Sequence, residues 1–222
     1  MSGPPRIDAV LFDFGGVFTE SPFEAARRFA ESIGVDPQVM LDTVFGPYEC
    51  DSDHPWHCLE RGELDLVRAR EKILELGRVG GFEADLFRVL AALARSTGPR
   101  QAFLDRAREL RRRGIATAIV TNNVREFRDA WRGMIPVDEL FNIVVDSCEV
   151  GYRKPDPRIF QKALEFLGGI PPEHAVFLDD YEGNVKAARL LGMHGIVVAP
   201  DPAEALAEFD RLVHTEDLRR SQ

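Results

Sequence analysis

Residues 7–17 of the chain read IDAVLFDFGGV. Positions 7–12 form an almost unbroken apolar run, which ends at Asp13 and is followed by Gly15 and Gly16. A short apolar run with such an end is typical of a strand that is covered on both faces, as strands are in parallel sheets. The segment therefore predicts a buried strand that carries a carboxylate to one edge of a sheet.

Four further apolar runs have the same character, at residues 115–121, 143–146, 175–179 and 195–198. Helical patterns lie between or after them, at residues 99–113, from Asp156-Pro157 to Gly168, at 183–192, and from Asp201-Pro202 onward. An Asp before a Pro is a typical helix start, and a Gly after the pattern is a typical stop. Alternating strands and helices with short connections predict an α/β fold with a doubly wound parallel sheet.

Residues 20–97 break this alternation and show no strand pattern. The string SPFE at 21–24 matches a capping box and predicts a helix to about residue 33. Asp36-Pro37 predicts a second helix start, residues 46–63 predict a loop, and residues 63–76 and 83–95 predict two more helices. We therefore expect an all-helical module at 20–97, with its exit near residues 97–99, inserted into a core formed by 1–19 and 98–222.

The chain has 222 residues, a net charge of −9 and a pI of about 5.1. Nucleic acid is not an expected partner, because such a surface repels a polyanion. No apolar stretch approaches the roughly 18 residues of a membrane span, so a membrane is not an expected partner either. Cys50, Cys58 and Cys148 have no metal-binding or redox spacing, which favours a reducing cytoplasm. Oligomeric state leaves no signal in the sequence.

Polar residues follow the predicted strands where each of them ends. They are Asp13 after the first strand, Thr121, Asn122 and Asn123 at the second, Lys154 beyond the third, and Asp179 and Asp180 at the fourth. Each of them alone is an ordinary turn, cap or surface residue. Ligands of open parallel sheets bind at the carboxyl ends of the strands, so the whole set predicts a site at that edge.

The chemistry of this set indicates phosphoryl transfer. Clustered carboxylates repel one another unless a cation lies among them, and oxygen ligands suit Mg²⁺. Lys154 and Thr121 suit a phosphate group. The cation and the Lys154 ammonium would offset the charge of Asp13, which could then approach an anionic phosphoryl group and form an aspartyl-phosphate. We therefore expect a Mg²⁺-dependent hydrolase of a small phosphorylated substrate.

Four strings resemble the motifs of the haloacid dehalogenase (HAD) superfamily: FDFGGV at 12–17, IVTNN at 119–123, GYRKPDPRIF at 151–160 and FLDDYEGNVKAARLLGM at 177–193. The inserted module resembles the helical C1 cap of that superfamily. The FDxGGV form is similar to that of the soluble epoxide hydrolase N-terminal phosphatase and the acyl-CoA dehydrogenase 10 HAD domain. The resemblance implies a Rossmann-like core with a helical cap, a Mg²⁺ cofactor and phosphatase activity.

The resemblance also implies roles in metal binding. Asp13 matches the nucleophile and a Mg²⁺ ligand, and Asp180 matches a direct acidic ligand. Gly15 matches a position whose main-chain carbonyl binds the metal. Asp179 and Asn184 match residues that hold the metal ligands in position without binding the metal themselves.

Phosphate binding is implied for three other positions. Thr121 and Asn122 match the phosphate-binding pair. Lys154 matches the catalytic lysine that orients both the nucleophile and the phosphate.

Gly15 departs from the usual HAD phosphatase pattern, which has Asp at this position. That Asp protonates the leaving alcohol and then activates water, and loss of such help costs about 10²–10⁴-fold in rate. A main-chain carbonyl survives the change to Gly, so metal binding need not be lost. Glu20, Asp53, His54 and His57 are candidates for a substitute acid by residue type, and each also fits a surface or capping role.

Two alternatives remain open. Gly15 favours a catalytically impaired phosphate-binding or regulatory HAD protein. A phosphonatase-like hydrolase has a small residue at the same position and uses a cap lysine, and Lys72 is the one lysine of residues 20–97. L-2-haloacid dehalogenases lack the acidic pair, so Asp179 and Asp180 argue against dehalogenation.

Overall fold

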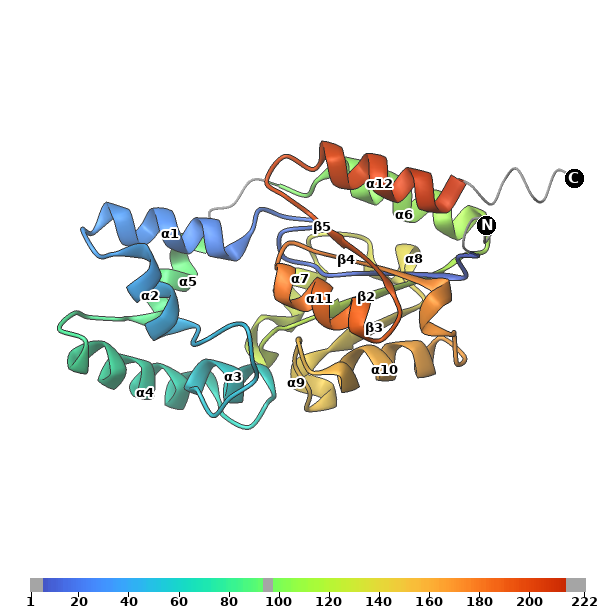
Figure 1. Cartoon of the computed structure of the whole chain (residues 1–222). Coiled ribbons are helices and arrows are strands. Elements are labelled where there is room, and N and C mark those ends of the chain that lie inside the picture. The colour runs from blue at the N-terminus through green and yellow to red at the C-terminus, as the bar shows by residue number, and fades with distance from the viewer. Residues whose placement is uncertain (1–5, 94–97, 215–222) are drawn as a thin grey trace, which may run out of the picture.

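The structure is a computed structural model that describes residues 6–93 and 98–214 (Figure 1). Its core is a five-stranded parallel sheet with strand order β3-β2-β1-β4-β5. The strands are β1 (Ala9–Phe12), β2 (Ala116–Thr121), β3 (Ile143–Asp146), β4 (Ala175–Asp179) and β5 (His194–Val197). The predicted α/β fold with a doubly wound parallel sheet is confirmed, and β3 and β4 have the bounds that the sequence predicted.

Helices cover both faces of the sheet. On one face lie α6 (Gln101–Arg112), α7 (Arg128–Arg132), α8 (Val137–Leu140) and α12 (Ala203–His214), around a core that includes Phe12, Phe103 and Phe209. On the other lie α10 (Pro157–Phe166) and α11 (Glu182–Leu190), whose core includes Phe160 and Phe177. Figure 1 shows α6 and α12 side by side above the sheet, with α10 below it. No helix in the described ranges is both long and apolar enough to cross a membrane.

A group of helices lies beyond one end of the sheet (Figure 1). They are α1 (Pro22–Ser32), α2 (Pro37–Val44), α3 (Pro55–Glu60), α4 (Leu66–Val79) and α5 (Leu86–Leu93), and we call this group the cap. The cap has its own hydrophobic cluster, which also includes Val124 and Phe127 from the segment after β2. Its predicted boundaries remain a prediction, because Arg95 and Thr97, the predicted ends of the last helix and of the module, lie outside the described residues.

Two local predictions for the cap were wrong. The stretch 46–63, predicted as a loop, contains α3. That helix starts because Pro55 occupies its first turn and the His54 ring accepts a hydrogen bond from the Trp56 N–H. The capping box at 21–24 does not form: α1 begins after Ser21, but the Ser21 side chain makes no capping bond and instead hydrogen-bonds Asp180. Asp36 does cap α2, as the sequence predicted.

Candidate active site

A lysine is shared between two carboxylates at the carboxyl ends of β1 and β4. Lys154 Nζ lies 2.7 Å from Asp13 Oδ1 and 2.7 Å from Asp179 Oδ2. The two carboxylates are neighbours because β1 and β4 pair in parallel, with Phe12 opposite Leu178. Burial alone would lower the pKa of Lys154, but Asp13 and Asp179 outweigh it and hold this pKa above its usual value. The lysine therefore stays charged.

Asp179 is fully buried, and the protein itself engages both of its oxygens. Oδ1 accepts a hydrogen bond from the Tyr181 main-chain N–H at 2.8 Å. Oδ2 accepts one from Asn184 Nδ2 at 3.0 Å in addition to the bond from Lys154. Asp179 therefore holds Lys154 and Asn184 in place and has little capacity left for a further ligand.

Three carboxylates are close enough to hold one metal ion. Asp13, Asp179 and Asp180 each bring an oxygen within 4.8 Å of the other two. Burial raises the pKa of Asp13 to about 6, against the opposing charge of Lys154. Burial, followed by the charges of Asp179 and Asp13, raises the pKa of Asp180 to about 8. The residues fit a divalent cation such as Mg²⁺, because it prefers carboxylate oxygens and would relieve this repulsion.

The two glycines after Asp13 are not equivalent. Gly16 has a φ of 73°, and a Cβ there would lie 2.1 Å from Asp180 Cγ, so only glycine fits. Gly15 is not among the glycines with positive φ, and a Cβ there would meet Pro22 Cδ at 3.3 Å. The close approach of Asp180 therefore requires Gly16, whereas at Gly15 a side chain would mainly crowd Pro22.

Asn122 acts as a clamp on Lys154. Its Nδ2 donates to the Lys154 carbonyl at 2.9 Å, and its Oδ1 accepts from the Lys154 N–H at 2.7 Å. Thr121, at the end of β2, is buried and borders the cavity above Asp13. The structure thus brings the predicted phosphate-binding pair to the site, while its role toward phosphate stays a prediction.

A cavity of about 650 Å³ opens above Asp13, between the core and the cap, and we call it the apolar cavity. Asp13, Thr121, Lys154 and Asp180 are among its polar lining residues. Its aromatic and aliphatic lining residues include Phe14, Phe23, Phe45, Trp56, Leu90, Phe127, Trp131 and Met134. An apolar cavity with a few convergent polar groups is typical of a small-molecule site.

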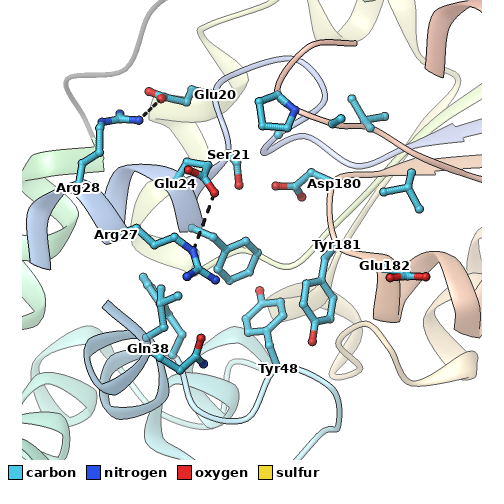
Figure 2. A pocket seen from close by; sticks show the side chains of 18 of the residues that line it. Glu20, Ser21, Glu24, Arg27, Arg28, Gln38, Tyr48, Asp180, Tyr181 and Glu182 are labelled. Carbon is cyan, nitrogen blue, oxygen red and sulfur yellow. Dashed lines mark hydrogen bonds and ion pairs between the residues drawn. The ribbon is translucent and has the colours of Figure 1, made fainter. Parts of the chain in front are cut away.

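A second cavity, of about 820 Å³, adjoins the first, and we call it the polar cavity. Ser21, Tyr48 and Asp180 line both cavities. Figure 2 shows the polar cavity, into which charged and amide side chains from α1 and α2 project, among them Arg27 and Gln38. The two cavities therefore meet at the predicted metal ligand Asp180 and differ in the chemistry of their walls.

Of the four candidates for a substitute acid, Glu20 lines both cavities and accepts a hydrogen bond from Arg28, which lines the polar cavity. Asp53 is exposed and does not line either cavity. His54 and His57 do not line them either: His54 caps α3, and His57 is completely buried and accepts a hydrogen bond from the Ser52 N–H. Burial lowers the pKa of His57 to about 3, so its imidazole is neutral.

Sequence reasoning missed three residues beside the site: Tyr48, Glu60 and Arg153. Arg153 Nε donates to Glu60 Oε2 at 2.7 Å, and the Tyr48 hydroxyl donates to Glu60 Oε1 at 3.1 Å. Arg153 and Glu60 are both buried, and they join the core to the cap. Their one visible signal was the consecutive pair Arg153-Lys154 in GYRKPDP, and no local pattern connects it with residues 48 and 60.

Residues 7–192 match the family model for a haloacid dehalogenase-like hydrolase. The chain is 31% identical over 218 residues to mouse acyl-CoA dehydrogenase family member 10, which covers 96% of this chain but only 20% of that protein. The sesquiterpene phosphatase astK of Aspergillus oryzae is 28% identical over 197 residues, 85% of this chain and 88% of that protein. A HAD family enzyme from Bacteroides thetaiotaomicron, solved with magnesium and inorganic phosphate, has a TM-score of 0.59 at 23% identity, with 88% of this chain and 96% of that chain covered.

Proposed function

Because the chain belongs to the haloacid dehalogenase-like hydrolase family, we propose that it is a Mg²⁺-dependent phosphatase that forms an aspartyl-phosphate on Asp13 and acts on the monoester of an apolar alcohol. The observation that carries this proposal is Lys154, which lies 2.7 Å from the Asp13 carboxylate below the apolar cavity. A buried carboxylate that is oriented by an ammonium is suited to attack an anionic phosphoryl group.

The residues of the site divide the work of phosphoryl transfer. Lys154 orients Asp13 and partly neutralises it, which reduces its repulsion from the incoming phosphate. Asp13, Asp180 and the main-chain carbonyl of Gly15 would hold Mg²⁺, which supplies positive charge to the phosphate oxygens. The Thr121 hydroxyl would donate to a further phosphate oxygen.

Asp179, Asn184 and Asn122 support these groups. Asp179 and Asn184 keep Lys154 and the Asp180 loop in position through the hydrogen bonds described above. Because the Asn122 amide holds the Lys154 main chain, a phosphate contact by Asn122 falls to its own main-chain N–H. These hydrogen bonds thus fix the charged groups in place around the position of the phosphorus atom.

The walls of the apolar cavity support an apolar alcohol as the leaving group. Beyond the polar residues near Asp13, the lining is mainly aromatic and aliphatic, with Trp131 and Phe14 in ring contact at 4.8 Å. An alcohol with several hydroxyl or ionic groups would lose hydration there without gaining partners. The similarity to a sesquiterpene phosphatase supports the same class.

The test is phosphate release from p-nitrophenyl phosphate and from straight-chain alkyl phosphates, with and without Mg²⁺. We expect Mg²⁺-dependent turnover of all of them, a kcat/KM that rises with alkyl chain length, and no turnover by Asp13→Asn. Met134 lines the cavity and is 40% exposed, so Met134→Glu should lower kcat/KM for long chains while Met134→Leu leaves it unchanged. Full turnover in metal-free buffer, or by Asp13→Asn, would contradict the mechanism.

Gly15 favours a second candidate, a phosphate-binding protein without turnover. It would bind inorganic phosphate in calorimetry but release none from any ester. A phosphonatase-like reaction lacks support, because Lys72 is exposed on α4 and does not line either cavity. Lys154 is the one lysine among the described residues that line the apolar cavity.

A further inference from the structure

Gly15 leaves the leaving alcohol without the carboxylic acid that usually protonates it. We propose that the Tyr48 hydroxyl of the cap donates this proton and that Glu60 and Arg153 hold Tyr48 in place for the task. This inference rests on the phosphatase function proposed above. It assigns Tyr48 as a catalytic residue and the other two as positioning residues.

The position of Tyr48 carries the first step. Tyr48 lines the apolar cavity together with Asp13, Gly15 and Lys154. In Figure 2 its ring stands between α2 and the loop after β4, and its hydroxyl end is directed toward Asp180. The Asn122 side chain, which clamps Lys154, is also in hydrogen-bonding contact with Tyr48. The hydroxyl therefore lies at the boundary between the polar residues around Asp13 and the space for the alcohol.

The support behind Tyr48 carries the second step. The Tyr48 hydroxyl donates to Glu60 Oε1 at 3.1 Å, Glu60 Oε2 accepts from Arg153 Nε at 2.7 Å, and the Arg153 guanidinium lies 4.8 Å from the centre of the Tyr48 ring. An ion pair without solvent exposure is costly unless its geometry is good and its further hydrogen bonds are satisfied. Here it fixes a cap tyrosine against the residue that precedes Lys154, so the position of Tyr48 is tied to the position of Lys154.

Glu20 is the competing acid, and its environment opposes the role. The hydrogen bond from Arg28 lowers the pKa of Glu20, so its carboxyl group is ionised at neutral pH and has no proton to give. Burial, and then the charge of Glu60, raise the pKa of Tyr48 well above its usual value, so Tyr48 keeps its proton. An ordinary phenol is a far stronger acid than an alkyl alcohol, so a leaving alkoxide is a base that can take this proton.

The two half-reactions balance with Tyr48 in this role. An Asp13 oxygen forms a bond to phosphorus while the bond from phosphorus to the alcohol oxygen breaks. The Tyr48 hydroxyl turns from Glu60 Oε1 to the alcohol oxygen, which takes its proton. The charge of Arg153 and the hydrogen bond from Asn122 favour the phenolate that remains, against the opposing charge of Glu60. Water then attacks the aspartyl-phosphate, gives one proton to the phenolate and displaces Asp13 as a carboxylate. Alcohol and phosphate leave, and Tyr48 is protonated again.

The dependence on the leaving group tests this role, because nitrophenolate leaves without a proton and an alkoxide does not. In Tyr48→Phe, we expect kcat for alkyl phosphates to fall by about 10²-fold or more, the scale of lost acid catalysis, while kcat for p-nitrophenyl phosphate changes by less than about threefold. Tyr181→Phe is the matched control. Its ring packs edge-to-face on Tyr48 at 5.2 Å, but its hydroxyl points the opposite way in Figure 2 and it does not line the apolar cavity.

Three further outcomes keep the inference separate from the proposed function. A wild type without turnover of either ester would refute the phosphatase itself, and the proton donor with it. Equal losses on both esters in a folded Tyr48→Phe, or equal selective losses in Tyr181→Phe, would overturn the role of Tyr48. Recovery of alkyl phosphate turnover by Gly15→Asp in the Tyr48→Phe background, without a matching gain on p-nitrophenyl phosphate, would support it.

Discussion

Arg153 and Lys154 are consecutive, both are buried, and each serves a different cluster of charges. Lys154 bonds Asp13 and Asp179, which come from the ends of two paired strands of the core. Arg153 bonds Glu60 at the end of α3 and so joins the core to the cap. The Lys154 cluster is therefore the candidate centre for phosphoryl transfer, and the Arg153–Glu60 ion pair is a contact that holds the cap against the core. A change at Lys154 should therefore affect the turnover of every ester. A change at Arg153 should affect mainly stability and, through Tyr48, the turnover of alkyl phosphates.

Lys154→Met should have the largest effect on turnover. The substitution leaves Asp13 and Asp179 without their shared counter-charge, so the nucleophile is misplaced and repels the phosphate. We expect kcat for p-nitrophenyl phosphate to fall by about 10⁴-fold or more, as for the loss of other residues that act with a nucleophile. Lys162→Met, on the outer surface of α10, is the control and should leave kcat unchanged.

Arg153→Met should have its largest effect on the free energy of unfolding. The substitution leaves the Glu60 carboxylate, which is 1% exposed, without its charged partner. Removal of one partner of a buried ion pair lowers the free energy of unfolding by about 3–5 kcal/mol. Chemical denaturation of the wild type and the variant measures the loss. The double variant Arg153→Met, Glu60→Leu should recover most of it, because neither charge then remains unpaired. A loss as large in the double variant as in Arg153→Met would show that packing of the arginine stem, not the charge pair, stabilises the contact.

The Lys154 cluster could be predicted from the sequence, and the Arg153 cluster could not. Parallel strands bring their carboxyl ends to one edge, so Asp13 and Asp179 had to lie near each other once the strands were recognised. Tyr48 and Glu60 come from a stretch that was predicted as a loop, and their partner Arg153 lies 93 residues from Glu60 along the chain. Ser21 shows the same limit: the local pattern indicated a cap, but its side chain hydrogen-bonds Asp180 from a distant element.

Gly15→Asp tests whether a carboxylic acid at position 15 of the core can take over the role that we assign to the Tyr48 hydroxyl of the cap. A Cβ at this position would lie 3.3 Å from Pro22 Cδ, so the variant is best made with Pro22→Ala and compared with Pro22→Ala alone. In a Tyr48→Phe background, where the cap supplies no proton, we expect turnover of alkyl phosphates to rise by up to about 10²-fold, the lower end of general acid catalysis, and that of p-nitrophenyl phosphate to change little. Thermal melting first establishes that the variants are folded. An equal gain on both esters would mean that the new carboxylate acts through the metal and not as an acid.

Gly16→Ala offers the contrast within the same loop. Its Cβ would lie 2.1 Å from Asp180 Cγ, at a φ of 73°, so we expect lower thermal stability and weaker Mg²⁺ binding. Gly15→Ala should change both properties much less, since it only crowds Pro22. Calorimetric titration with Mg²⁺ separates the two variants, and similar losses in both would contradict the different roles assigned to these glycines.

The smallest expected effect is a dependence of Mg²⁺ stabilisation on pH. The pKa of Asp180 is raised to about 8 and that of Asp13 to about 6 in the folded protein without a cation, against 3.8 for an ordinary Asp. Between pH 3.8 and about 8 these two carboxyl groups bind more protons in the folded state than in the unfolded state. The stability of the metal-free protein therefore falls as pH rises from about 4 to 8. Mg²⁺ must displace the same protons, and its stabilising effect should therefore grow over the same range.

With Mg²⁺ at about 100 times its Kd the gain is about 2.7 kcal/mol, or roughly 5–10 °C in Tm, at pH 8, and it should be clearly smaller at pH 5.5. Melting curves with Mg²⁺ and with EDTA at the two pH values measure it. Asp180→Asn should remove most of both the pH slope and the Mg²⁺ shift, and a shift of equal size at both pH values would mean that the cation binds away from these carboxylates.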